Sequence, residues 1–389
     1  MVYDFDTPVE RRGSDSLKWR VAENELPMWV ADMDFRTAPP ILQAMQERLN
    51  HGVFGYGTIP QAWRDACLHW WQRRYGWRMD REGLFFCTGV IPAVSALLRE
   101  LTEPGDQVLV QTPVYNTFFH CIEQNRCRRV ESPLLLQDGV YSMDFADLER
   151  KLGEPETKVM ILCNPHNPIG KCWDRETLER VGAMAKRNHV TVLSDEIHCD
   201  LTEPGRHYIP FASVSQDCSE VNITCLAPTK TFNLAGLHTA AVYGADPALR
   251  ERISAAMDTF GLSMPNAFAA AAAIAAYEEG EDWLEQLREY VFENRRTVEA
   301  FLDRELPRVR AIRSDATYLV WLDVSAFPGT GREIAAFLRR ETGLFLIGGN
   351  AYGTGGEHFL RMNIACPRSV CMDGLNRLKR GLNAWQAGR

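Results

Sequence analysis

Residues 158–170 read KVMILCNPHNPIG, a short apolar run followed by a polar turn that is rich in proline. The apolar part, Lys158–Cys163, is typical of a strand that is buried on both faces. A helical pattern follows at Arg175–Arg187, and a second apolar run follows at Val190–Leu193. A strand, a helix and a strand in this order indicate a parallel βαβ unit. The polar residues Asn164–Gly170 then lie at the carboxyl end of the first strand.

The same alternation extends in both directions along the chain. Each predicted strand is a short apolar run, and helical patterns separate several of them. The sequence therefore predicts an α/β fold with a mostly parallel sheet of six or seven strands between helices. The further strands are predicted at Leu84–Cys87, Val108–Gln111, Asn222–Leu226 and Thr239–Tyr243, and the further helices at Pro92–Leu101 and Tyr115–Gln124.

The pattern changes after about residue 280. A long amphipathic helix is predicted at Glu281–Glu305, followed by strands at Tyr318–Asp323 and Phe359–Ile364 with a helix at Arg332–Glu341 between them. This pattern indicates a smaller α+β domain. No flexible linker divides the two parts, so we expect a continuous helix to join them. We expect residues 49–285 to form the large domain, and residues 1–48 and 286–389 to form the small one.

Composition excludes several classes of function. Acidic residues outnumber basic ones by 51 to 43, which disfavours binding to nucleic acid or anionic lipid. The longest apolar run, Ala267–Ala276, is about half the ~20 residues that cross a bilayer, so we expect a buried helix and no membrane span. The eleven cysteines are scattered and odd in number. Because the first residues also lack the apolar core of a secretory signal, we expect a cytoplasmic protein.

Several motifs of common catalytic sites are missing from the sequence. It contains no paired Cys-x-x-Cys motifs, no His-Glu-x-x-His and no phosphate loop, so we expect no metal site and no nucleotide site of that kind. The glycine cluster Gly353, Gly355 and Gly356 is not preceded by a strand and followed by a helix, as a dinucleotide-binding fingerprint would be. We therefore expect it to form a loop.

Polar residues follow four of the predicted strands. Ligands of open parallel sheets bind outside the carboxyl ends of the strands, so these residues are expected to share one crevice. They include an amide, Asn167, a carboxylate, Asp195, a lysine, Lys230, and a helix start at Thr88–Pro92. A lysine can form an imine, a carboxylate can keep a pyridine nitrogen protonated, and a helix start can bind phosphate. The set therefore suits pyridoxal phosphate.

The order of these motifs resembles a known superfamily. NPHNPIG, SDEIHCDL, APTKTF with GLH, and FLRMNIA are similar to the ordered motifs of the fold-type I pyridoxal-phosphate enzymes, the class I/II aminotransferase superfamily. RRGSDSLKW, MWVADMDF, FGYG and the histidine of DEIH resemble the MalY/PatB-type carbon-sulfur lyases, which include cystathionine β-lyases. The resemblance covers nearly the whole chain. It implies a large domain with a mostly parallel seven-stranded sheet between helices, and a smaller α+β domain.

The resemblance implies roles for the residues nearest to the cofactor ring. Lys230 would be the Schiff-base lysine and the base that moves the Cα proton. Asp195 would pair with the pyridine nitrogen, and Asn167 would donate to the phenolic oxygen. Tyr115 would lie across the ring and pass a proton to the leaving group. The structural alternatives are an exposed lysine, a helix cap, a turn-forming asparagine and a core aromatic residue.

The resemblance also implies how the phosphate is held. The backbone N–H groups of Gly89 and Val90 would bind it at a helix start, with Thr88 and Thr229 beside them. Tyr56 would reach it from the neighbouring subunit, which makes the expected active unit a homodimer.

Four further residues are assigned to the substrate by the resemblance. Arg361 would bind the α-carboxylate through two parallel hydrogen bonds, although a surface arginine is the alternative. Asn363, Val30 and Ala31 would border the same pocket.

Two positions depart from an ordinary aminotransferase. His238 stands where many of these enzymes have an arginine for the phosphate, so the phosphate contacts cannot all be transferred. His198 stands where a tyrosine commonly contacts the cofactor, and we assign His198 to the cofactor as well. Both departures favour the lyase subgroup.

The leading hypothesis for the reaction is β-elimination from a sulfur amino acid such as L-cystathionine or cysteine, which would give a thiol (homocysteine or sulfide), pyruvate and ammonia. Transamination is the alternative, because both reactions use the same residues and differ in the next protonation. A regulatory protein that binds a transcription factor is the alternative from another class, since some members of the subgroup have that role. The sequence does not define the preferred substrate.

Overall fold

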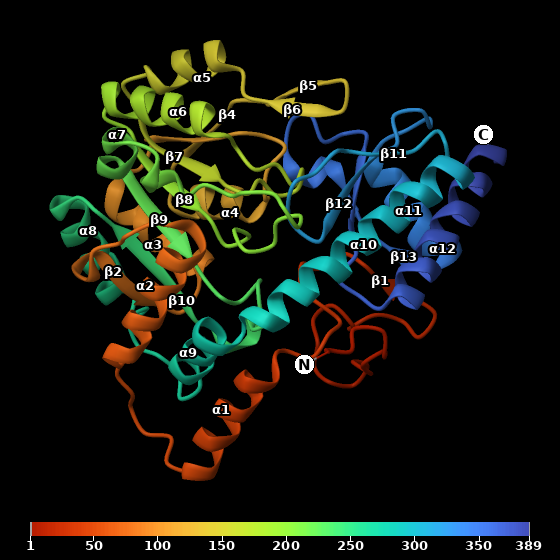
Figure 1. Ribbon diagram of the computed structural model, residues 1–389. Helices are drawn as coiled ribbons and strands as arrows, with labels where there is room; N and C mark the ends of the chain where they lie inside the picture. Colours follow the sequence, from red (N-terminus) through yellow and green to blue (C-terminus); the bar gives the residue numbers. More distant parts are fainter. Residues whose placement is uncertain (1, 389) are drawn as a thin grey trace.

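The computed structural model describes residues 2–388 and contains two main sheets, which lie in two different parts of the molecule (Figure 1). The larger sheet has seven strands in the order β2-β10-β9-β8-β7-β3-β4. These strands are β2 (Leu84–Cys87), β3 (Gln107–Val110), β4 (Arg128–Glu131), β7 (Thr157–Cys163), β8 (Thr191–Asp195), β9 (Asn222–Leu226) and β10 (Ala240–Gly244).

All neighbouring strands in this sheet are parallel except at β10, which is antiparallel to both β2 and β9. The mostly parallel seven-stranded sheet is therefore confirmed. As a result, β2, β7, β8 and β9 all place their carboxyl ends at the same edge. β8 extends two residues beyond the predicted strand, so that Asp195 is its last residue.

Helices cover both faces of the sheet because successive strand residues point to opposite sides. In β7, Val159 and Ile161 pack with α3 (Val90–Leu101) and α4 (Thr117–Gln124), whereas Met160 and Leu162 pack on the opposite face. α8 (Pro247–Thr259) lies on the first face, and α2 (Gln61–Tyr75), α5 (Phe145–Leu152), α6 (Arg175–Arg187), α7 (Gln216–Glu220) and α9 (Ala269–Glu279) lie on the second. α9 contains most of the expected Ala-rich helix, and its alanines are largely buried.

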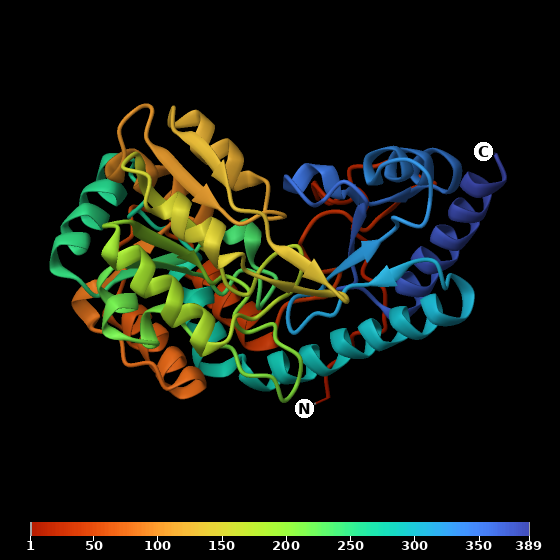
Figure 2. The same cartoon turned by 90° about the horizontal axis from the view of Figure 1, so that it is seen from above.

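The smaller sheet has four strands in the order β11-β12-β15-β14, and its neighbouring strands are antiparallel. The long helix α10 (Glu281–Glu305) runs continuously between the two parts of the molecule, as expected (Figure 2). The other elements here are β11 (Arg310–Ala311), β12 (Leu319–Asp323), β14 (Ile347–Gly348), β15 (Phe359–Asn363), α11 (Gly331–Thr342) and α12 (Arg368–Ala387). Gly353, Gly355 and Gly356 lie in the loop before β15, as predicted.

The N-terminal segment lies against the smaller sheet (Figure 1). Its short strand β1 (Leu26–Pro27) pairs with β13 (Leu344–Phe345), and the backbone of Asp34 donates to Ala365 O at 2.9 Å. α1 (Pro39–His51) follows and packs on α9. An exposed hairpin, β5 (Leu135–Gln137) and β6 (Val140–Ser142), completes the strands. Within residues 2–388, no helix is long and apolar enough to cross a membrane.

Candidate active site

The carboxyl ends of the parallel strands surround one cavity of about 240 Å³. Ten of the residues predicted for the site line it, from segments that lie far apart in the sequence. They are Ala31, Thr88, Gly89, Val90, Tyr115, Asn167, Asp195, His198, Thr229 and Lys230. The cavity is also lined by residues that the sequence reasoning did not assign to the site, among them Ile91, Cys163, Ile197 and Thr239.

Wider clefts of about 450 and 620 Å³ open beside the β5–β6 hairpin, and neither contains a residue predicted for the site. The smaller cavity is therefore the candidate active site, because the buried amine of Lys230, carboxylate of Asp195 and imidazole of His198 meet there.

Lys230 lies in the tight turn that follows β9. Its Nζ donates to the backbone carbonyl of Ala31, which comes from the N-terminal segment. Burial lowers the pKa of Lys230 to about 8, while the negative charges of Asp32 and Asp195 partly oppose this shift and the positive charge of Arg361 adds to it. The amine is therefore substantially neutral near pH 8 and can accept a proton or act as a nucleophile.

Asp195 ends β8 at the centre of the sheet, where the register places it between Cys163 and Cys225. Its Oδ1 accepts a hydrogen bond from the backbone of Ile197 at 3.2 Å. Burial raises the pKa of Asp195 to about 6, against the lowering effects of that bond and of Lys230. A buried carboxylate of this kind is stabilised by a cationic partner such as a protonated ring nitrogen.

His198 follows Asp195 by three positions and is 3% exposed. Burial lowers the pKa of His198 to about 3, and the nearby positive charges of Lys230 and Arg361 lower it further, so the imidazole is neutral. Its Nδ1 is buried without a hydrogen-bond partner in the described structure. This unpartnered polar atom at the cavity is available to a bound group.

Arg361 lies on β15 of the smaller sheet and is 5% exposed. Its Nη1 donates to Asn167 Oδ1 at 3.2 Å, and its Nη2 donates to Trp29 O at 2.8 Å. Its Nε is buried and has no hydrogen-bond partner in the described part of the chain. The guanidinium therefore joins the smaller sheet to the cavity and keeps one donor free for an anion.

The start of α3 opens into the cavity. Gly89 is its N-cap residue, and no side chain caps the helix. A Cβ at Gly89 would lie 3.2 Å from Pro92 Cδ, so a side chain would crowd the turn. The first N–H groups of an uncapped helix form an anion site. His238 also lines the cavity, in a left-handed conformation with φ of 49°, and it is exposed at the rim.

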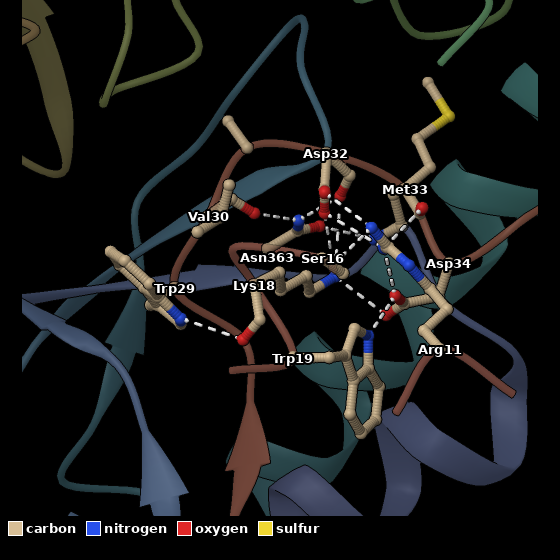
Figure 3. Close-up of polar contacts among 12 residues, drawn as sticks. Arg11, Ser16, Lys18, Trp19, Trp29, Val30, Asp32, Met33, Asp34 and Asn363 are labelled. Atoms are coloured by element: carbon tan, nitrogen blue, oxygen red, sulfur yellow. Dashed lines mark hydrogen bonds and ion pairs between the residues drawn. The ribbon is translucent and has the colours of Figure 1, made fainter. Parts of the chain in front are cut away.

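The remaining predicted residues lie outside the lining of the cavity. Asn363 donates to Val30 O at 2.6 Å and borders the site through the N-terminal segment (Figure 3). Tyr56 is 99% exposed and lies on the loop after α1. The sequence reasoning missed Asp32 and Tyr318, whose hydroxyl donates to Ala31 O at 3.0 Å. The only sequence signals were the first aspartate of WVADMDF, for Asp32, and a tyrosine at a predicted strand start, for Tyr318.

These features fit pyridoxal phosphate. The cavity presents an amine for its carbonyl carbon, a buried carboxylate for its pyridine nitrogen and an uncapped helix start for its phosphate. The unpartnered Nδ1 of His198 and the mostly apolar wall suit a planar ring.

The chain is similar to known proteins along nearly its whole length. The chain is 45% identical over 386 residues to cystathionine β-lyase PatB of Bacillus subtilis, covering 98% of this chain and 100% of that protein. Cystalysin of Treponema denticola, whose crystal structure contains pyridoxal 5'-phosphate, has a TM-score of 0.95 at 32% identity and covers 99% of this chain and 100% of that one. The pyridoxal-phosphate-bound C-S lyase of Staphylococcus hominis has a TM-score of 0.92 at 32% identity over 98% of both chains. Residues 24–378 match the family model for aminotransferases of class I and II, and the chain belongs to that family.

Proposed function

We propose that the protein is a pyridoxal-phosphate-dependent carbon-sulfur β-lyase that acts on L-cystathionine or a related S-substituted cysteine. The observation that carries this proposal is the 45% identity, along the whole chain, to a cystathionine β-lyase, in a protein whose cavity holds Lys230 and Asp195. The products would be a thiol, pyruvate and ammonia.

The cofactor would be held by groups already in place. Asp195 would face the pyridine nitrogen, Lys230 the carbonyl carbon, and the N–H groups of Gly89 and Val90 the phosphate, with Thr88 and Thr229 beside it. Asn167 and His198 would contact the ring substituents. When bound, the cofactor supplies an electron sink for the charge that develops at the substrate's Cα.

Arg361 would bind the substrate carboxylate. Its buried Nε has no partner among the described residues, and Asn167 and Trp29 already fix the plane of its guanidinium. A fixed guanidinium orients the substrate, because its N–H groups match the two oxygens of a carboxylate.

Lys230 would move the Cα proton. A pKa of about 8 allows Nζ to be neutral in a useful fraction of molecules and to take a proton when substrate is bound. Tyr115 lines the same cavity and would donate its hydroxyl proton to the sulfur as the carbon-sulfur bond breaks.

We also propose a homodimer. The loop after α1 projects from the molecule (Figure 1), and Tyr56 on that loop is exposed. Large apolar side chains on α1, on this loop and after α8 are exposed too, and a second copy of the chain would cover them. These residues are Leu42, Leu49, Val53, Phe54, Phe260 and Met264. Light scattering of the purified protein tests this proposal, which a monomer would contradict.

The cytoplasm is the proposed location. All eleven cysteines are free thiols, and ten of them are buried, which suits a reducing compartment. Binding to a transcription regulator stays a prediction from the resemblance.

The test of the proposed reaction is to mix the cofactor-loaded protein with L-cystathionine in the absence of any keto acid. We expect pyruvate and free thiol in equal amounts over many turnovers. Turnover that requires an added keto acid, with conversion of that acid to an amino acid, would replace the lyase by an aminotransferase. No reaction in either assay would contradict cystathionine as the substrate, and cysteine and other S-conjugates are the next compounds to test.

A further inference from the structure

Residues 29–34, WVADMD, form an irregular segment beside the cavity, which we name the strap (Figure 3). Each backbone carbonyl from Trp29 to Asp32 accepts a hydrogen bond from a side chain. Arg361 donates to Trp29 O at 2.8 Å, and Asn363 donates to both Val30 O and Asp32 O at 2.6 Å. Lys230 and Tyr318 donate to Ala31 O. The strap is therefore the shared partner of the candidate substrate-binding residues.

Two side chains of the strap, Asp32 and Asp34, belong to a partly buried group of charges (Figure 3). Asp34 is 4% exposed and accepts hydrogen bonds from Arg11 at 2.7 Å, from Lys18 at 2.7 Å and from Trp19 at 2.8 Å. Asp32 accepts two hydrogen bonds from Arg11, at 2.8 and 3.2 Å. We name Arg11, Lys18, Asp32 and Asp34 the charge cluster. It contains two cations and two anions and is balanced.

Within this cluster Lys18 and Asp34 are buried, whereas the side chains of Arg11 and Asp32 are 19% exposed. Lys18 is 1% exposed, and removing a lysine and an aspartate from water costs more than such a pair commonly returns. The cluster does, however, hold the Asp34 carboxylate in a single arrangement. Three donors that converge on Asp34 from different directions leave its carboxylate one orientation, and the strap backbone on either side is fixed with it.

A second set of contacts ties the strap to the turn that carries Lys230. Asn233, three positions after Lys230, accepts from Met33 N at 3.0 Å and donates to Met33 O and Phe35 O at 3.0 and 2.9 Å. The strap is therefore held at one end by the charge cluster and along its length by the site itself.

We propose that the charge cluster positions the strap, and through it the guanidinium of Arg361, for binding of the substrate carboxylate. Lys18 and Asp34 are positioning residues in this scheme, since neither lines the cavity. The inference rests on the proposed function in one respect only, namely that Arg361 binds the carboxylate of the substrate. It predicts a larger effect on substrate binding than on proton transfer, although Lys230 also donates to the strap.

The test compares three variants of the full-length, cofactor-loaded protein. Asp34→Asn keeps the size of the side chain and removes its charge. Trp19→Phe removes one neutral donor to the same carboxylate and is the milder change. Arg288→Met is the control, because Arg288 is 8% exposed and bonds to Thr202 without contacting the strap.

Two measurements do not depend on turnover. The first is the apparent dissociation constant of L-alanine, an α-amino acid without a leaving group, from the absorbance change of the bound cofactor. The second is hydrogen exchange of the peptide that covers the strap. For Asp34→Asn we expect alanine to bind about tenfold more weakly, because a displaced Arg361 would lose about one charge-assisted hydrogen bond to the carboxylate. We also expect faster hydrogen exchange in the strap. Trp19→Phe should give a smaller change of the same sign.

Steady-state kinetics with L-cystathionine should then show KM raised by a similar factor, with kcat within about threefold of the wild type. Arg288→Met should change neither KM nor alanine binding, even where it lowers Tm. If strap exchange rises while alanine affinity stays within twofold, the cluster is only structural and the inference fails.

An equal loss of affinity in Arg288→Met would attribute the effect to general loosening and would also overturn the inference. If Asp34→Asn does not fold, Trp19→Phe decides by the same two measurements. Failure of the wild type to release pyruvate would refute the proposed function alone, because alanine binding still tests the strap.

Discussion

Arg361→Lys keeps the positive charge beside the cavity and removes the planar fork of N–H groups. The side chain is 5% exposed, and its guanidinium bonds to Asn167 and Trp29 while Nε has no partner among the described residues. A lysine ammonium cannot bond to both of these acceptors and also present two parallel donors to a carboxylate. The variant should therefore bind the substrate carboxylate through fewer hydrogen bonds.

The expected magnitude follows from the bond that is lost. One hydrogen bond to a charged group contributes about 1.5–3 kcal/mol, so a loss of about 2 kcal/mol corresponds to a decrease of about 30-fold in kcat/KM. The carboxylate is bound in both the ground state and the transition state, so the decrease should come from a higher KM with kcat nearly unchanged.

The assay is the initial rate of pyruvate release over a range of L-cystathionine concentrations. Arg187→Lys is the matched control, because Arg187 is an exposed surface residue paired with Glu149 and should behave like the wild type. Thermal unfolding checks that Arg361→Lys is folded. A KM within threefold of the wild type, or a decrease confined to kcat, would refute the assignment of the carboxylate to Arg361.

Three further predictions follow from particular groups. Burial lowers the pKa of Lys230 to about 8. In the cofactor-free protein, labelling of Nζ by an amine-reactive reagent should therefore reach half its plateau near pH 8. A midpoint near that of an exposed lysine would contradict the burial. Tyr115→Phe should lower kcat by about 10²-fold with little change in KM, measured by pyruvate release, and an unchanged kcat would remove Tyr115 as the proton donor. Gly170→Ala should lower the free energy of unfolding by more than about 2 kcal/mol, measured by denaturant titration. The reason is that Gly170 has a positive φ of +68° and that an added Cβ would collide with Ser314 Oγ. An unchanged free energy of unfolding would show that the turn adapts to the side chain.

The βαβ pattern was readable from the sequence because it depends on local apolar runs. β2 and β9 begin and end where the sequence predicted, and so do the helices α6 and α10. The edge strand β4, RRVE, was missed because its pairing with β3 is not encoded in an apolar pattern. The extension of β8 to Asp195 was missed for a related reason, since pairing with β9 keeps two polar residues in the strand. The domain boundaries at residues 48 and 285 stay predictions.

The sequence by itself determined the fold class and the chemical groups of the site. Lys230, Asp195 and Asn167 could be found because each lies at or within a few residues of the carboxyl end of a strand, and the carboxyl ends of parallel strands meet at one edge. The tertiary structure alone decided how these groups are tuned and oriented. Arg361 reaches Trp29 across 332 positions, and the pKa values of Lys230 and Asp195 are set by burial. Contacts between segments so distant in sequence depend on how the smaller sheet packs against the larger part, and local patterns carry no information about that packing.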